Sequence, residues 1–317
     1  MTTNALAAGV DLEALPGITI QERTVCVSIN FRCWGITRQI GEEDYDSEAS
    51  KKLTTANKLL VSGPEYRAIK RLTWTTRGQV EDRWALSCSM MKLGNYMISV
   101  GNVDAVDEYL RGQLRAWDAA VETFIEAYPA MKLRASLPKD KGGLGPLYNP
   151  KDYPDADVVR SRFQMQYQWY TTLVPDSLSG LSAGLFERET EKARVQFRDA
   201  FGEIRQGLRS GFAALVKRMT DRLTEDDDGK PRVFRDTLVT KMTDFLDTIV
   251  ARDPTNDAEL LALTERAKAI MESVPDARAL REDGELREYV RAQFAAIESK
   301  VDGMVEVQER AFSFDDV

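Results

Sequence analysis

Alternation of hydrophobic and polar side chains predicts three strands in the first 175 residues. Between residues 24 and 32, hydrophobic and often β-branched side chains occupy every second position. This period of two places them on one face of a half-buried strand. Residues 96–100, between two glycines, predict a second strand. Residues 162–173 alternate most strictly, with glutamines on one face and, on the other, Phe163, Met165, Tyr167 and Trp169.

Hydrophobic positions spaced by three and four residues predict helices over most of the remaining chain. In the first half we expect helices over about 47–61, 64–84 and 103–128, with Pro129 ending the third or falling one turn too early. After residue 175 the pattern is helical throughout, and the expected helices span about 183–223, 233–250, 256–274 and 284–304.

Together these elements predict an α+β fold that is mostly α. A small antiparallel sheet packs on helices, and a long-helix hairpin or bundle follows. Residues 136–154 are rich in proline and glycine and predict a linker. The expected organisation is a flexible tail (1–20), an N-terminal α+β region (21–135), the linker (136–154), and a strand plus helical bundle (155–317).

The longest expected helix has consequences for packing. At 1.5 Å per residue, 41 residues would span about 60 Å, so this helix must protrude or be covered by its neighbours. Gly207 and Gly211 lie one turn apart on its apolar side. We expect both glycines to face another helix, of this chain or of a partner copy, or to mark a bend.

Composition narrows the possible chemistry. The 317 residues are 43% hydrophobic and 30% charged, a balance typical of globular proteins. The chain contains no histidine, which excludes Ser-His-Asp and Cys-His nucleophile systems and His-ligated metals. No phosphate-binding P-loop motif occurs. We therefore expect no catalytic, cofactor-binding or metal-binding residues, and no enzyme activity. A metal nuclease built from carboxylates alone is a distant alternative.

The cysteines and the hydropathy pattern bear on location. Cys26, Cys33 and Cys88 are too few and too scattered for a disulfide framework, which favours a reducing cytoplasm. We expect them to be free cysteines that pack as small hydrophobic side chains. No signal peptide is visible at the start and no apolar stretch reaches 18 residues. The expectation is a cytoplasmic protein without a membrane partner.

Charge is distributed unevenly along the chain. The net charge of −8 belongs entirely to residues 151–317, whereas residues 51–92 hold nine basic and three acidic side chains. Aromatic side chains are interleaved with these basic residues, a combination that can bind nucleic acid. If the basic side chains form one exposed stripe, nucleic-acid binding gains support; if they pair with acids, it loses support. The candidate contacts are Lys51, Lys52, Lys58, Lys70, Arg71, Arg77 and Arg83.

The aromatic strand predicted at residues 162–173 allows two interpretations. Its aromatic side chains form either the inner face of a sheet or a platform on which bases stack. The inner face is favoured, because the opposite face of the strand carries glutamines where a base-binding platform usually has basic neighbours.

Eight short stretches along the chain carry a resemblance to a known family: residues 27–35, 124–129, 152–154, 185–189, 229–236, 244–247, 257–260 and 311–312. Together they resemble a family of bacterial, phage and plasmid proteins known as domain of unknown function 3150. The resemblance covers about residues 24–312 and implies no catalytic residues. It implies a genetic setting, because members tend to be encoded beside a MoxR-like AAA+ ATPase and a protein with a von Willebrand factor A domain.

Two function classes follow from these observations. The first is a non-enzymatic interaction or adaptor protein of a phage or mobile element, which binds itself or the AAA+ ATPase and its von Willebrand factor A partner. The second, less favoured, is a nucleic-acid-binding accessory protein in phage or plasmid recombination. The acidic helical half favours the first class, and the basic segment at 51–92 favours the second.

Overall fold

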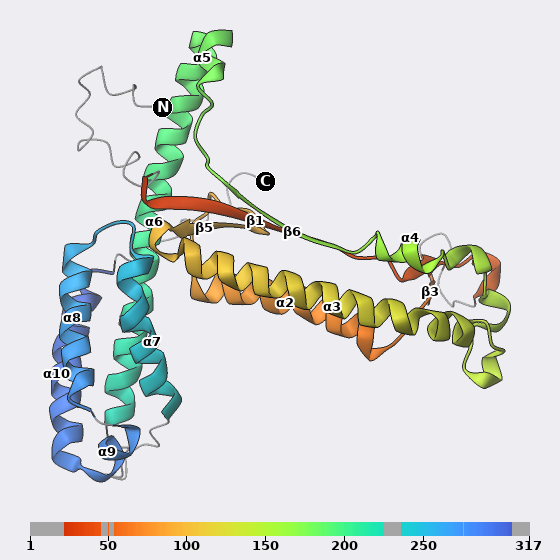
Figure 1. The fold of residues 1–317 in the computed structure, drawn as a ribbon. Coiled ribbons are helices and arrows are strands. Elements are labelled where there is room, and N and C mark those ends of the chain that lie inside the picture. The colour runs from red at the N-terminus through yellow and green to blue at the C-terminus, as the bar shows by residue number, and fades with distance from the viewer. Residues whose placement is uncertain (1–21, 46–49, 51–53, 225–235, 275, 306–317) are drawn as a thin grey trace.

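A four-stranded antiparallel sheet lies between two groups of long helices in the computed structural model (Figure 1). The structure describes residues 22–45, 50, 54–224, 236–274 and 276–305. The fold is α+β and mostly α, as the sequence predicts. The expected tail at residues 1–20 lies outside the described residues.

All three strands predicted from the alternating pattern are present in one sheet. They are β1 (Thr24–Arg32), β5 (Asn95–Ser99) and β6 (Gln164–Tyr170), joined by the two-residue strand β4 (Ala85–Leu86), which is too short to leave a pattern. The order across the sheet is β4-β5-β1-β6, and each neighbouring pair is antiparallel.

A hairpin of two long helices covers one face of the sheet. It consists of α2 (Pro64–Arg83) and α3 (Val103–Ala135), which run side by side in Figure 1. Val27 and Ile29 of β1 are fully buried against this hairpin. Trp117 of α3 packs with its ring centroid 5.1 Å from that of Phe31, so the odd positions of β1 contribute to this core.

The other face of the sheet meets a helical bundle. Side chains on this face supply a second core, which includes Cys26 of β1, Met97 of β5 and Leu86 of β4. A polar contact adds to the junction, since Asn102 Nδ2 donates to the carbonyl of Ala251 at 3.1 Å. The bundle comprises α6 (Ala183–Leu223), α7 (Asp236–Arg252), α8 (Ala258–Glu272), α9 (Ala277–Glu282) and α10 (Gly284–Asp302).

The helix expected at residues 47–61 is wrong over the part that the structure describes. Residues 57–59 form a strand, β3 (Asn57–Leu59), paired with β2 (Thr37–Gln39). Lys58 explains the difference, because its side chain is nearly buried and reaches Asp152 at 2.7 Å. An extended backbone directs Lys58 toward this distant partner, and such tertiary contacts override local propensity.

The segment at 136–154 does not separate two units as expected. It forms three short turns of 3₁₀ helix, η4 (Lys139–Lys141), η5 (Gly145–Leu147) and η6 (Pro150–Asp152), and continues through α4 (Ala156–Arg160) into β6 of the same sheet. Tyr153 is buried and donates its hydroxyl to the carbonyl of Leu60 at 2.9 Å. The chain leaves the first unit after β6 and passes through α5 (Ser177–Leu181) to α6. The short helices η2 (Glu42–Asp44) and η3 (Val100–Asn102) complete the elements.

Helix α3 continues through Pro129, beyond the end expected from the sequence. A proline inside a helix costs about 3 kcal/mol, so contacts on both sides must offset it. Tyr128 stacks edge-on against Trp34, with ring centroids 5.5 Å apart, and its hydroxyl donates to the carbonyl of Pro154 at 2.8 Å. Beyond the proline, Lys132 donates to the carbonyl of Tyr153 at 3.1 Å.

The two glycines singled out on α6 have different surroundings. A Cβ added at Gly211 would lie 3.8 Å from Phe245 of α7, so this position faces a helix of the same chain. A Cβ added at Gly207 would meet nothing within 4 Å. Gly207 therefore lacks the expected contact within the chain, and its contact with a partner copy stays a prediction.

Because of these different surroundings, the same substitution should change the free energy of unfolding differently at the two glycines. Gly211→Leu should lower the free energy of unfolding by about 1–3 kcal/mol, because the added side chain must displace Phe245 from its stack on Phe212. Gly207→Leu should leave it unchanged or raise it by up to about 1 kcal/mol, because leucine favours helix. Urea denaturation of the two variants measures the difference. Equal effects at both positions would contradict this packing.

Candidate interaction surfaces

The seven basic residues proposed as nucleic-acid contacts do not form one stripe. Lys51 and Lys52 lie outside the described residues. Lys58 is bound to Asp152, and its ammonium also donates to the carbonyl of Leu147 at 2.7 Å. Arg77 is half-buried, lies over the ring of Phe31 and faces the carbonyl of Ile29. Lys58 and Arg77 therefore serve the fold.

Arg83 is exposed but stands apart from the remaining candidates. It lies at the C-terminal end of α2, over the ring of Trp84 at 5.2 Å. Twelve residues of helix, about 18 Å, separate it from Arg71. At 100° per residue, Arg83 points to a different side of α2 from Lys70 and Arg71.

Lys70 and Arg71 belong to a compact surface, the Trp74 cluster, defined as Arg67, Lys70, Arg71 and Trp74. The four positions follow a spacing of 0, 3, 4 and 7, which gathers them on one face of α2. All four are exposed, and Trp74 is 71% exposed. Among the described residues no acid forms an ion pair with the three cations. Arg67 was not among the contacts expected from the sequence, although its helical spacing from Lys70, Arg71 and Trp74 identifies it.

The aromatic face of β6 is not a platform for bases. Phe163 and Met165 are buried, and Tyr167 and Trp169 pack against the same core as α3. Asp107 of α3 accepts hydrogen bonds from the Tyr167 hydroxyl at 3.1 Å and from Trp169 Nε1 at 3.3 Å. The inner-face interpretation is therefore confirmed.

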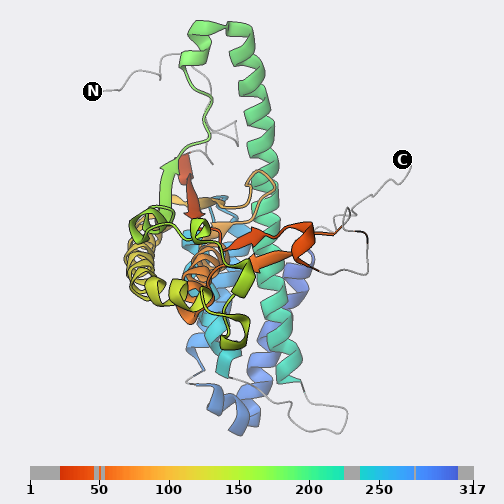
Figure 2. The same ribbon diagram turned by 90° about the vertical axis from the view of Figure 1, so that its right-hand side faces the viewer.

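A second surface is the projecting arm, defined as residues 173–196. It comprises α5 and the first 14 residues of α6, and it extends beyond the sheet in Figures 1 and 2. The buried residues of α6 begin only at Phe197. Leu181 is 83% exposed and Leu173 is 53% exposed on this arm. At Leu173 and Leu181 the arm therefore presents apolar side chains that the described residues leave largely uncovered.

A hollow beside the sheet contains cysteine and methionine side chains. It has a volume of about 300 Å³, lies at the β4–β5 connection and is lined by Cys88, Met91 and Asn95 among others. Beside it, burial and the neighbouring Cys88 raise the pKa of the Cys26 thiol to about 11. A thiol with that pKa is protonated at neutral pH and is a poor nucleophile or metal ligand. Within the described residues, no three cysteine, aspartate or glutamate side chains gather as metal ligands.

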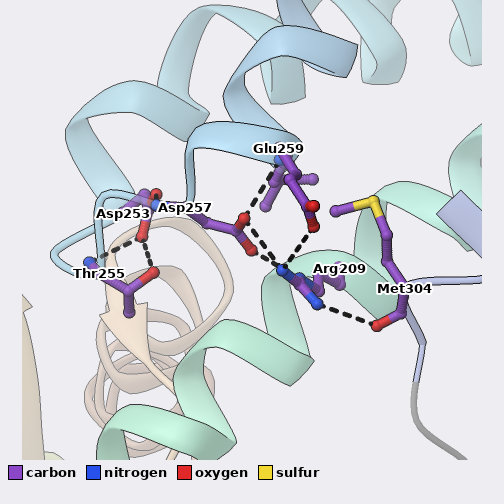
Figure 3. A network of polar contacts seen from close by, with 7 residues as sticks. Arg209, Asp253, Thr255, Asp257, Glu259 and Met304 are labelled. Carbon is purple, nitrogen blue, oxygen red and sulfur yellow. Dashed lines mark hydrogen bonds and ion pairs between the residues drawn. The ribbon is translucent and has the colours of Figure 1, made fainter.

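A buried polar network holds one end of the bundle together (Figure 3). Arg209 of α6 forms a two-pronged ion pair with Asp257, with distances of 2.6 and 3.0 Å, and donates to the carbonyl of Met304 at 3.1 Å. Asp253 accepts from the backbone and the hydroxyl of Thr255. The network joins α6, the start of α8 and the segment after α10, which is a structural role.

The charge of Asp257 depends on this network. Burial opposes ionisation, but hydrogen bonds from Arg209 and the Leu260 N–H, with the charges of Arg209 and Arg205, outweigh it and hold the pKa of Asp257 below its ordinary 3.8. A pKa lowered by folding gives stability above the unfolded value, and this stability is lost as the pH falls through the folded pKa.

Comparison with protein-family models, with curated proteins and with solved structures finds no match for this chain. The resemblance to the domain of unknown function 3150 therefore stays a prediction. Among the described residues, no helix has the length and apolar content needed to cross a lipid bilayer.

Replacing Arg209, the cation of the buried pair, should lower the free energy of unfolding by an amount that depends on pH. Arg209→Met should lower the free energy of unfolding by about 3–5 kcal/mol at pH 7, since Asp257 would remain charged and buried. The deficit should shrink toward pH 3, where Asp257 of the variant becomes protonated. Urea titrations at both pH values measure it.

The matched control for this variant is Arg198→Met, also on α6. Arg198 and Asp199 are both at least 60% exposed, so the change should stay within about 0.5 kcal/mol. A deficit for Arg209→Met that is equal at pH 7 and pH 3 would show that Asp257 carries no charge that matters to folding.

Proposed function

We propose that this chain is a non-enzymatic adaptor that joins protein partners in a phage or mobile-element assembly. The observation that supports this most strongly is the projecting arm. Its 14 helical residues from Ala183 to Gln196 bury no side chain, and Leu173 and Leu181 beside them are exposed. Most helical stability in proteins comes from packing of an apolar face, which this part of α6 lacks, so a covering partner would stabilise the arm.

The shape of the molecule supports the same proposal. The α2–α3 hairpin and the bundle extend in different directions from the sheet, and the arm extends in a third (Figure 1). A body with three projections can contact separate partners at the same time. The family resemblance supplies candidates for these partners, namely a MoxR-like AAA+ ATPase and a protein with a von Willebrand factor A domain.

Affinity purification of the tagged chain from its native host, with quantitative mass spectrometry, tests the adaptor proposal. We expect the neighbouring AAA+ ATPase or the von Willebrand factor A protein among the enriched proteins. Leu181→Ser, which removes the most exposed apolar side chain of the arm, should reduce this enrichment about tenfold, as loss of a central interface residue commonly does.

Leu133→Ser is the matched control. Leu133 is 67% exposed but lies on α3, far along the chain from the arm. Its substitution should leave the enrichment unchanged. If neither protein is enriched, or if both variants reduce enrichment equally, the arm is not the adaptor surface.

The Trp74 cluster favours a second candidate function, the binding of single-stranded nucleic acid. An exposed indole can stack on a base while neighbouring cations contact phosphates. Three features of α2 fit this arrangement: three cations within two turns that form no ion pair in the described part of the chain, an exposed Trp74, and no acid on the same face of α2 before Glu81. The cluster is small, and the acidic second half of the chain would repel a long strand.

A salt titration distinguishes specific from scattered contacts. If the Trp74 cluster binds single-stranded DNA, micromolar affinity should persist at about 0.15 M salt and fall at least tenfold in a Lys70→Ala/Arg71→Ala variant. The control is Lys139→Ala/Lys141→Ala, which removes two exposed lysines from the η4 turn. Binding that disappears by about 0.15 M salt, and responds equally to both double variants, would rule out a site at Trp74.

A further inference from the structure

The backbone of β6 forms an open sheet edge. Strand β6 pairs with β1 on one side only, and it is the last strand in the order β4-β5-β1-β6. In Figure 2 it is the outermost strand of the sheet, with α3 below it and extending outward past it. The other end of the order is the two-residue strand β4. Within the described ranges no strand pairs with the outer side of β6, so this part of the chain leaves the sheet one long free edge.

The register shows which backbone groups face outward. The N–H of Ile29 bonds to the carbonyl of Gly94 on the β5 side, so the backbone of Ile29 points away from β6. Ile29 lies opposite Tyr167. In an antiparallel pair, two opposed residues either both bond to each other or both point away, and the pattern alternates along the strand. Tyr167, and with it Met165 and Trp169, must direct N–H and C=O to the free edge.

This edge lacks the features that normally prevent pairing. Natural edge strands are short, bulged, charged or interrupted by proline. Strand β6 has seven residues, Gln-Met-Gln-Tyr-Gln-Trp-Tyr, with no charge and no proline. Three N–H and three C=O groups are thus presented at a spacing that another extended polypeptide strand would match. Nucleic acid offers no backbone with that alternating pattern of donors and acceptors.

A groove runs along the same edge. It has a volume of about 440 Å³ and is lined by Asn30, Leu114, Met165, Gln166, Tyr167 and Gln168. Leu114 comes from α3, so the groove lies between the free edge and the helix beneath it. None of the six lining residues carries a charge. On α3, Arg111 is paired with Asp107 at 2.5 Å. An uncharged strand suits this groove better than a charged one.

We infer that the β6 edge accepts an uncharged, extended segment of a partner protein as a fifth strand of the sheet. Apolar side chains at alternate positions of that segment contact Leu114 and the α3 side of the groove, and polar side chains align with Gln166 and Gln168. A second copy of β6 is a poorer occupant. Two-fold pairing of the sheets would bring two α3 helices together on the same side, where each extends past its own edge (Figure 2).

The inference rests on the proposed adaptor function and names the mode by which one partner binds. It uses a surface other than the arm, so the two can fail separately. Loss of partner enrichment on Leu181→Ser tests the adaptor through the arm. The edge is tested with peptides alone, without any protein from the host.

The first experiment pans a phage-displayed library of random twelve-residue peptides against the full-length chain at 0.15 M salt. We expect enriched peptides to carry β-branched or aromatic residues at alternate positions, no central proline and little charge. The best peptide is then synthesised and titrated by fluorescence anisotropy. Failure to enrich any such family would overturn the inference.

Amide exchange measured by NMR locates the bound peptide. Peptide binding should slow exchange at Met165, Tyr167 and Trp169 at least about tenfold, because their N–H groups become hydrogen-bonded. Exchange at Gln166 and Gln168, which β1 already protects, should not change. Protection at other sites, or protection of the three residues without peptide through self-association, would contradict a partner strand at this edge.

Variants of the groove complete the test. Gln168→Lys adds a charge on an exposed side chain beside the edge and should weaken the peptide at least about tenfold, as edge lysines do. Leu114→Glu should do the same from the α3 side, provided that its melting temperature stays near that of the parent. Ala116→Glu places the same charge on an exposed position elsewhere on α3 and should have no effect. Equal binding by all three variants would overturn the inference.

Discussion

Burial of both faces of β1 and β5 is the constraint on which the rest of this structure depends. Odd positions of β1, such as Val27 and Ile29, enter the core beneath α2 and α3, while Cys26 enters the core of the bundle. Strand β5 does the same with Ile98 and Met97. Because successive side chains of a strand point to opposite faces, a shift of one residue would exchange the contents of the two cores. The sheet thus fixes the register of both helical units at once.

This arrangement explains how surfaces far apart in sequence acquire fixed relative positions. The arm continues directly from α6, whose buried residues from Phe197 onward belong to the bundle core. The free edge of β6 is held in place by its pairing with β1. The Trp74 cluster lies on the α2–α3 hairpin, which covers the face of the sheet opposite the bundle. A junction packed on both faces of one sheet fits the proposed adaptor function, because partners bound at separate surfaces would be held at a defined geometry. The polar network around Arg209 and Asp257 adds a specific contact at one end of the bundle.

Much of this fold follows from the sequence because its strongest patterns are long. Seven alternating residues in β6 and 41 residues of helical period in α6 leave little ambiguity, and both elements match their predictions. The prediction failed where distant contacts decide the conformation. Lys58 lies in a strand because Asp152 holds its side chain, and α3 passes Pro129 because Tyr128 and Lys132 are held on either side of it. Of the surfaces, the Trp74 cluster was half visible as Lys70 and Arg71. The open edge was not visible, because a sequence does not show which strand lies last in a sheet.

The central claim is that the shared sheet makes the two helical units fold as one, and calorimetry of the full chain tests it most directly. The account predicts a single unfolding transition whose calorimetric and van't Hoff enthalpies agree. It also predicts that Met97→Ala, which removes a buried contact on the bundle side, moves the whole transition to lower temperature. Two separable transitions, of which Met97→Ala shifts only one, would show that the sheet does not couple the two units.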